Sequence, residues 1–211
     1  MATKVREKII QDLKNEIARG ILGSGQRLTE SSLCVRYRVG RTVVREALRH
    51  LEQEGFIIIS QNVGAVVREL TQKDIEHIYD LLGTLEGLSV RIGTAYVTHD
   101  KIKQLEDLLA KMDNARDPTE FFNNNFEFHT QLTSLTDNPR LMRFMEILRT
   151  QATRISLRSF FNPGQITASV SEHRKILDAI QNTNSVKAER LVREHYLLSK
   201  NRLIKYLNSS L

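Results

Sequence analysis

The stretch "GRTVVREALRHLEQEGF", residues 40–56, decides how the first third of the chain folds. Apolar side chains recur along it at helical spacing: Val44, Leu48 and Leu51. Arginines four residues apart share the opposite face: Arg41, Arg45 and Arg49. Gly55 then supplies a helix stop signal. The stretch therefore predicts a short helix that is apolar toward its own domain and cationic toward solvent.

The segments around this helix complete a compact pattern. Residues 4–19 have the apolar spacing of a helix that ends at Gly20, and Thr29 is placed to cap a second short helix through Leu33 and Val35. "FIIIS" and "AVVREL", separated by "QNVG", read as two strands joined by a turn. Helix, helix, turn, helix and hairpin within residues 1–70 is the layout of a winged helix-turn-helix module, which places its recognition helix in the DNA major groove.

The charge distribution fits contact with a polyanion. The formal net charge is +6, and residues 27–50 hold six Arg and two Glu, whereas residues 71–211 hold 19 basic and 17 acidic side chains. A solvated helix face would account for the same excess of charge. Arginine nevertheless suits DNA, because its planar fork binds guanine or phosphate through two parallel hydrogen bonds.

The rest of the chain is predicted to be helical throughout. Turn and cap signals divide residues 71–211 into six helices: 72–96, 99–114, 119–136, 140–161, 165–182 and 185–207. We therefore expect two domains, residues 1–70 and residues 71–211, with a mainly α fold. The second domain is expected to be an all-α six-helix bundle.

Composition bears on the compartment. No apolar run approaches the length that a membrane span needs, and the amino-terminal segment is a charged amphipathic helix rather than a secretory signal. The single Cys34 cannot form an intrachain disulfide, which favours a reducing compartment. We therefore expect a cytoplasmic protein that has no contact with membranes.

Three helices of the second domain carry a histidine inside the apolar stripe. Asn125 and His129 lie in the stripe of 119–136, His173 in that of 165–182, and His195 in that of 185–207. A single buried histidine is usually hydrogen-bonded to a neighbour. Three of them favour a shared polar centre, because an unpartnered buried imidazole is costly. Neutral imidazole is a common ligand of divalent metals, so we expect a metal ion, with Zn or Ni favoured.

Both halves of the chain resemble one family of bacterial regulators. "GQRLTESSLCVRYRVGRTVVREALRHLEQEGFI" is similar to the DNA-binding signature of the GntR family, FadR subfamily. "NNNFEFH", "SEHRKILDAI" and "REHY" look like the metal-ligand segments of its helical FCD effector domain. The resemblance implies a homodimeric, ligand-responsive transcription factor, more often a repressor, that binds a pseudo-palindromic double-stranded operator.

The resemblance also implies roles for individual residues of the first domain. DNA contacts fall on Arg41, Thr42 and Arg45, with support from Arg27, Ser31 and Arg49, and with Gly64 letting the wing tip approach the minor groove. Two residues depart from the family pattern. Gly40 replaces the usual Ser or Thr that opens the recognition helix, and Val63 replaces a basic residue, so that wing contacts pass to Asn62.

In the second domain the resemblance implies four metal ligands: Asn125, His129, His173 and His195. Asn125 stands where Asp is commonest, so all four ligands are neutral and the ion is expected to bind less tightly. Leu82 stands where an Arg commonly pairs with a carboxylate effector. Three other arginines are candidates to bind an organic-acid effector in its place: Arg91, Arg154 and Arg158.

Two alternatives compete with this interpretation. The same DNA-binding domain could carry a metal-free sensor for acyl or lipid ligands. A histidine-ligated metalloenzyme is the other, since an open metal site can activate water. An enzyme needs a general base at the metal, and neither nearby acid is expected there, because Glu127 points off the ligand face and Glu172 diverges from the stripe. The regulator is therefore preferred.

Overall fold

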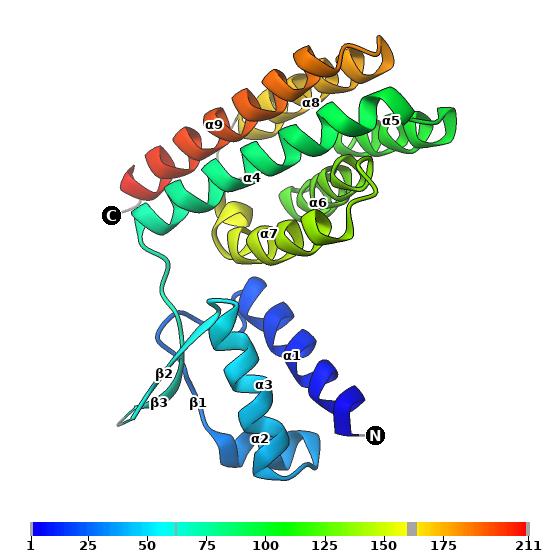
Figure 1. Cartoon of the computed structure of the whole chain (residues 1–211). Coiled ribbons are helices and arrows are strands. Elements are labelled where there is room, and N and C mark those ends of the chain that lie inside the picture. The colour runs from blue at the N-terminus through cyan, green and yellow to red at the C-terminus, as the bar shows by residue number, and fades with distance from the viewer. Residues whose placement is uncertain (1, 62, 160–163, 210–211) are drawn as a thin grey trace. The chain divides into compact units, whose positions relative to one another are not determined.

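A computed structural model describes residues 2–61, 63–159 and 164–209 of the chain, without the side chains of residue 2 and residues 154–159. The chain divides into two compact units, residues 1–71 and 72–211, and each is described by itself. Figure 1 labels their helices and strands. Among the described residues, no helix is long and apolar enough to cross a lipid bilayer.

The first unit contains three helices and a small antiparallel sheet. Its elements are α1 (Ala2–Ala18), β1 (Arg27–Leu28), α2 (Glu30–Tyr37), α3 (Arg41–Gln53), β2 (Ile57–Ser60) and β3 (Gly64–Val67). The strand order is β1-β3-β2, and Ile57 pairs with Val67 across the hairpin. The predicted winged helix-turn-helix layout is confirmed. The two-residue strand β1, which the sequence did not predict, adds a third strand by pairing Arg27 with Val66.

Local signals explain the ends of α2 and α3. The Thr29 side chain caps α2 by accepting a hydrogen bond from the backbone N–H of Ser32. Gly40 precedes α3 and offers no side-chain cap, as expected from the missing hydroxyl. Helix α3 packs against both α1 and α2. The unit has one apolar core: Ile9, Leu13, Ile17, Leu33, Val44, Leu48, Leu51 and Phe56.

The second unit is a bundle of helices. Its elements are α4 (Gln72–Gly93), the short 3-10 helix η1 (Thr94–Tyr96), α5 (His99–Asp113), α6 (Pro118–Ser134), α7 (Pro139–Ser159), α8 (Gln165–Gln181) and α9 (Ser185–Ser209). The six predicted helices are all present, and their ends differ from prediction by a few residues, except that the predicted end of the fourth, at residue 161, lies outside the described residues. The largest difference is at α4, which ends at Gly93 because the chain tightens into η1.

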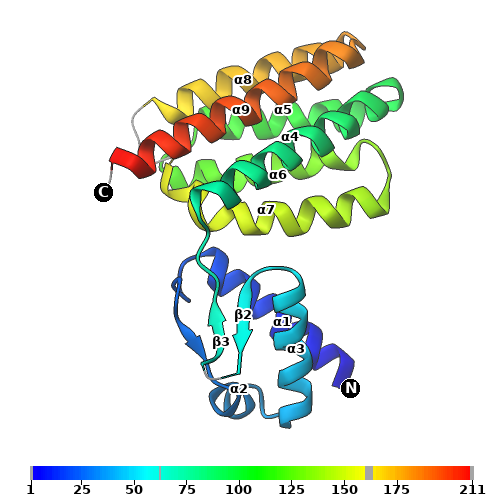
Figure 2. The ribbon, with the colours of Figure 1, turned by 60° about the vertical axis from the view of Figure 1, so that its left-hand side comes forward.

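Helix α4 organises the bundle, packing against α6, α7 and α9 (Figure 2). Glycines make its contact with α9 close. A Cβ atom at Gly83 would lie 3.1 Å from Cβ of Tyr196, and one at Gly87 would lie 3.3 Å from Cγ of both Arg193 and Glu189. At its other end α4 meets the carboxyl end of α6, where a Cβ atom at Gly93 would lie 2.4 Å from the backbone carbonyl oxygen of Leu135.

These contacts predict the effect of adding one methyl group. Gly93→Ala should destabilise the bundle by about 1 to 3 kcal/mol or more, because the methyl meets backbone that cannot rotate away. Gly83→Ala should cost less, because the shortest contact of its methyl, 3.1 Å to Cβ of Tyr196, is less severe than the 2.4 Å contact at Gly93. Chemical denaturation of both variants measures the difference, and equal stabilities would contradict the assignment of Gly93 as a close-contact position.

Candidate DNA interface and histidine centre

Helix α3 presents its arginines as the sequence predicts. Val44, Leu48 and Leu51 are buried, whereas four polar residues on the other side are exposed: Arg41, Thr42, Arg45 and Arg49. The face that carries these side chains is free to meet a large ligand.

A groove gathers several of the predicted DNA-binding residues. Arg27 from β1, Arg45 and Arg49 from α3, and Gly64 from β3 line the same groove. Gly64 has a left-handed backbone (φ 79°), which favours glycine, and the Arg27 side chain lies 3.8 Å from where its Cβ would be. The groove therefore combines three guanidinium groups with the start of the wing strand.

The other predicted DNA-binding residues lie outside the groove lining. Gly40 and Ser31 are exposed, and so is Thr42. Asn62 lies outside the described residues, and Val63 next to it is half exposed.

One member of the groove was not predicted. Glu30, the first residue of α2, accepts a hydrogen bond of 2.8 Å from Nε of Arg45 and forms an ion pair with it. The hydrogen bond to Glu30 raises the pKa of the Arg45 guanidinium. Within the described part of the chain, Arg41 and Arg49 form no ion pair. No local sequence pattern predicts the contact between Glu30 and Arg45, because the two residues belong to different helices.

The three histidines meet in the core of the bundle. His129 on α6, His173 on α8 and His195 on α9 each offer a ring nitrogen, and these atoms lie within 4.8 Å of one another. Nε2 of His129 is 3.3 Å from Nε2 of His173. All three side chains are buried, with 5%, 0% and 4% of their surface exposed. The apolar stripes of three helices thus bring their polar residues to one point.

Two carboxylates orient two of the three histidine rings, those of His129 and His195. Oε1 of Glu86 lies 2.7 Å from Nδ1 of His129, and Oε2 of Glu172 lies 2.8 Å from Nδ1 of His195. Arg202 in turn donates two hydrogen bonds to Glu172, at 2.6 and 2.8 Å. With the Nδ1 protons directed at the carboxylates, the Nε2 lone pairs are left for a ligand, which is the usual arrangement behind metal-binding histidines.

The position of Glu172 corrects one expectation. Glu172 does leave the stripe of α8, but it does not diverge from the centre, because α9 packs on α8 so that His195 reaches its carboxylate. Glu127, in contrast, is exposed and accepts a hydrogen bond from Gln131, away from the histidines.

The charge states of these groups suit metal ligation. Burial lowers the pKa of His173 well below its ordinary value, and the nearby His195 and His129 add to the effect. Burial also lowers the pKa of His195, in opposition to its hydrogen bond with Glu172. Burial alone would raise the pKa of Glu172, but His195 and Arg202 outweigh it and lower that pKa to about 2. At neutral pH His173 and His195 are therefore uncharged, and Glu172 is ionised.

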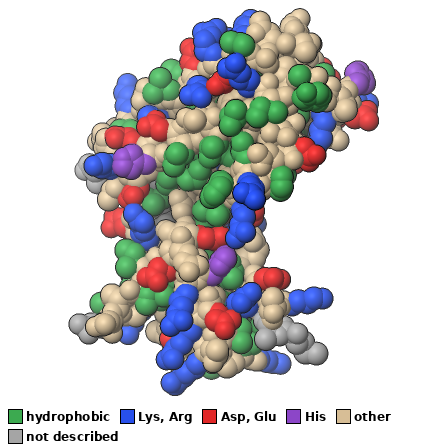
Figure 3. Space-filling model, in the orientation of Figure 1, with side chains coloured by type: hydrophobic (Ala, Val, Ile, Leu, Met, Phe, Trp, Pro, Cys, Tyr) green, Lys and Arg blue, Asp and Glu red, His purple; other side chains and the backbone are tan. Residues whose placement is uncertain are grey.

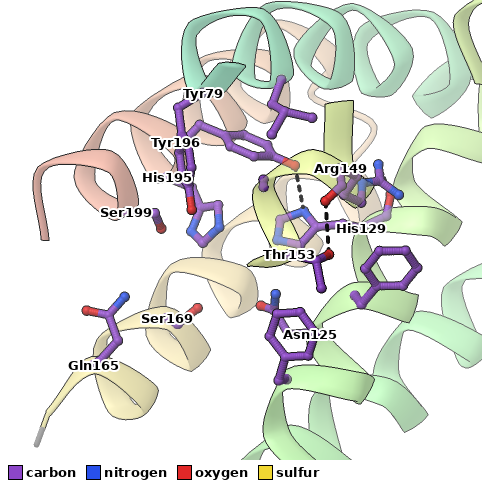
Figure 4. A pocket seen from close by; sticks show the side chains of 14 residues that line it. Tyr79, Asn125, His129, Arg149, Thr153, Gln165, Ser169, His195, Tyr196 and Ser199 are labelled. Atoms are coloured by element: carbon purple, nitrogen blue, oxygen red, sulfur yellow. Dashed lines mark hydrogen bonds between the residues drawn. The ribbon is translucent and has the colours of Figure 1, made fainter. Parts of the chain in front are cut away.

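Asn125 adds a candidate oxygen ligand to the histidine centre. It lines one pocket together with His129 and His195 (Figure 4), and its Oδ1 atom is buried without a hydrogen-bond partner among the described residues. A buried oxygen acceptor of this kind is rare in a folded protein. Three imidazole nitrogens and one amide oxygen fit a divalent transition metal.

A charged network beneath His129 was missed by the sequence reasoning. Glu86 is completely buried, and its Oε2 accepts hydrogen bonds from Nη2 of Arg149 at 2.9 Å and from the Tyr196 hydroxyl at 3.1 Å. The Thr133 hydroxyl lies 3.3 Å from the same oxygen. Burial raises the pKa of Glu86, but the hydrogen bond with His129 and the charge of Arg149 reverse the shift and lower it.

The signal for this network was present in the sequence. Glu86 falls midway between Leu82 and Val90, and Arg149 falls between Met145 and Ala152, each in a buried stripe. The rule that singled out the histidines, a polar residue inside an apolar stripe, applies equally to both.

Among the described residues, no predicted effector arginine lines the pocket. Leu82, which stands where an Arg was expected, is buried in the pocket lining, and the guanidinium there belongs to Arg149. Arg91 does not line this pocket. It lies on the exposed side of α4 and pairs with Glu189 at 2.8 Å, so its proposed contact with an effector is not supported. The side chains of Arg154 and Arg158 lie outside the described residues.

The buried pair predicts a large cost for a single substitution. Arg149→Leu leaves the Glu86 carboxylate buried without its guanidinium, which should destabilise the bundle by about 3 to 5 kcal/mol. The double variant Glu86→Gln with Arg149→Leu should recover part of that loss, because no uncompensated charge remains. Denaturant unfolding of the two variants measures both values, and a single variant as stable as the parent would show that the pair is unimportant.

The two units together define a class of protein, namely a DNA-binding transcriptional regulator with a helical second domain. Residues 5–67 match the family described as "Bacterial regulatory proteins, gntR family", and residues 76–198 match the FCD domain. The chain therefore belongs to the GntR family and carries an FCD domain. Its family makes it a transcriptional regulator rather than an enzyme, so the metalloenzyme alternative falls away.

Relatives along most of the chain agree with this assignment. The uncharacterised regulator YdhC of Bacillus subtilis (strain 168) is 27% identical over 188 residues, covering 87% of this chain and 84% of YdhC. The transcriptional repressor RspR of Escherichia coli (strain K12) is 25% identical over 194 residues, covering 90% and 85% of the two chains. The solved structure of E. coli McbR/YncC shares the fold, with a TM-score of 0.80 at 20% identity over 96% of this chain and 98% of that one.

Proposed function

We propose that this regulator is a cytoplasmic repressor that binds a pseudo-palindromic operator as a homodimer and releases it in response to a small molecule. Residues 1–70 form the DNA-binding domain, and residues 71–211 form the effector and dimerisation domain. Repression is supported by RspR, which is named a transcriptional repressor. The observation that carries the sensory part is the convergence of three buried imidazoles, with the unpartnered Oδ1 of Asn125 in the pocket that His129 and His195 also line.

On the DNA side, the exposed face of α3 enters the major groove. Arg41, Thr42 and Arg45 contact bases and nearby phosphates, because the opposite face of the helix is committed to the core. Support comes from the residues around the groove and the wing: Arg27, Ser31, Gly40, Arg49, Asn62 and Gly64.

On the sensory side, four residues hold one divalent ion: Asn125, His129, His173 and His195. Zn or Ni is favoured, because imidazole nitrogen suits both. The ion would add a positive centre to a pocket that is also lined by the Arg149 guanidinium and by apolar residues such as Leu82 and Phe122. Effector oxygens, such as those of an organic acid, would be attracted to that centre.

Control of DNA binding needs a difference in effector affinity between two states of the protein. Helix α4 offers the shortest route by sequence, because it follows directly on the DNA-binding domain and its Glu86 contacts His129. A change in the position of His129 would therefore reach α4, which is the first helix after the DNA-binding domain in the chain.

Helix α4 also carries the surface that we assign to the dimer. Leu81, Leu88 and Ile92 are 41 to 49% exposed, and with the half-buried Leu85 they form a stripe at helical spacing. Figure 3 shows hydrophobic side chains gathered along this part of the helical domain. A contiguous exposed apolar stripe favours a protein partner, and a second copy packed across a two-fold axis would match the symmetry of the operator.

The DNA-binding proposal predicts the effect of removing one guanidinium. Arg45→Ala should weaken binding to the operator by about 1 to 3 kcal/mol and relax the preference for one base pair. Quantitative binding to the operator and to random DNA at one salt concentration measures this. An equal loss on both DNAs would instead make Arg45 a phosphate contact.

The metal proposal predicts which variants lose the ion. Protein purified without chelator should contain nearly one equivalent of Zn or Ni by elemental mass spectrometry, and His129→Ala should remove it without affecting binding to random DNA. His77→Ala is a matched control, because His77 is exposed on α4. Absence of metal from the parent protein, even after incubation with both ions, would favour a metal-free sensor for acyl or lipid ligands.

A further inference from the structure

Arg45 differs from the other arginines of α3 because its guanidinium is held. Its Nε donates to Oε1 of Glu30 at 2.8 Å, whereas Arg41 and Arg49 form no ion pair with any described residue. The Arg45 and Glu30 side chains are 57% and 35% exposed. An ion pair this exposed contributes little to folding stability. Stability therefore does not explain why a carboxylate lies among the arginines of this face.

The position of Glu30 is fixed from both sides. Leu28 before it is buried in the strand that pairs with β3, and Thr29 caps α2 through the backbone N–H of Ser32. Glu30 follows as the first helical residue, so its carboxylate starts from a rigid backbone. A negative charge on a surface that meets phosphates also opposes binding to any DNA.

The geometry of the pair leaves the useful part of Arg45 available. A guanidinium has five N–H donors, and the contact with Glu30 engages the one on Nε. The four donors on the two terminal nitrogens remain for a ligand. Guanine presents O6 and N7 in the major groove as two acceptors, which a terminal fork can bind together.

We propose that Glu30 is a specificity-determining residue, which positions the terminal nitrogens of Arg45 for a guanine of the operator. This inference rests on the proposed function, in which α3 binds DNA. Holding Nε restricts the rotation of a long side chain before DNA arrives, so less conformational freedom is lost when the base contact forms. Arg41 and Arg49, which are not held, are suited to follow phosphates instead.

This role predicts two effects of opposite sign. Glu30→Ala should reduce the preference for guanine at the Arg45 position on the order of tenfold, because the fork is no longer aligned. The same change should strengthen binding to random DNA, because a negative charge leaves the interface. A purely structural role for Glu30 would weaken binding to both DNAs, and direct reading of cytosine by the carboxylate would alter a different base position.

The experiment is a selection of binding sites from a random DNA library with the parent protein, Arg45→Ala, Glu30→Ala, Glu30→Gln and Glu46→Ala. Binding of each to the selected site, to its single-base variants and to random DNA is then measured at one salt concentration. Glu46→Ala is the matched control, because Glu46 carries the same charge on α3 but pairs with Arg6, at 3.3 Å. Thermal melting verifies that each variant is folded. Glu30→Gln retains an acceptor for Nε and guards against a folding defect in the alanine variant.

The expected result is that Arg45→Ala and Glu30→Ala relax the same base position, that Glu30→Gln relaxes it less, and that Glu46→Ala leaves it unchanged. Full guanine preference in folded Glu30→Ala and Glu30→Gln would overturn the role of Glu30 while leaving the proposed function intact. If Arg45→Ala relaxed no position, the base contact of Arg45 would itself be wrong, and the role of Glu30 would fall with it.

Discussion

The helical domain depends on one buried carboxylate. Glu86 has no exposed surface, so its charge must be balanced within the protein. It lies on α4 and is met by His129 from α6, Arg149 from α7 and Tyr196 from α9. A shift of any one of these helices would leave a charge or a polar group buried and unpaired. The network therefore fixes how four helices pack, and at the same time it orients the first histidine of the candidate metal centre.

Much of this architecture could be predicted from periodicity. Apolar spacing located the helices, and polar residues inside the stripes identified His129, His173 and His195. The helical repeat also correctly predicted that the Arg45 side chain points away from the core. These predictions succeed because a helix has a fixed repeat, so a position in the sequence defines a direction in space.

What could not be predicted depends on contacts between elements. Glu30 and Arg45 lie on separate helices, and only the packing of α2 on α3 brings them together. Glu172 was correctly placed beside the α8 stripe, but the approach of α9, which brings His195 to it, has no local signal. The position of a residue in the helical repeat gives the direction of its side chain. The partner of that side chain depends on which other helix packs against it.

The glycines at Gly83 and Gly87 determine how α4 behaves mechanically. Because neither glycine has a side chain, the backbone of α4 lies close against the side chains of Tyr196, Arg193 and Glu189 on α9, and a rotation or translation of either helix would make these atoms collide. Helices α4 and α9 are therefore expected to move together as one rigid unit. In the proposed function, we expect a ligand that displaces His195 on α9 to move α4 together with α9, including the first residues of α4, which follow the DNA-binding domain in the chain.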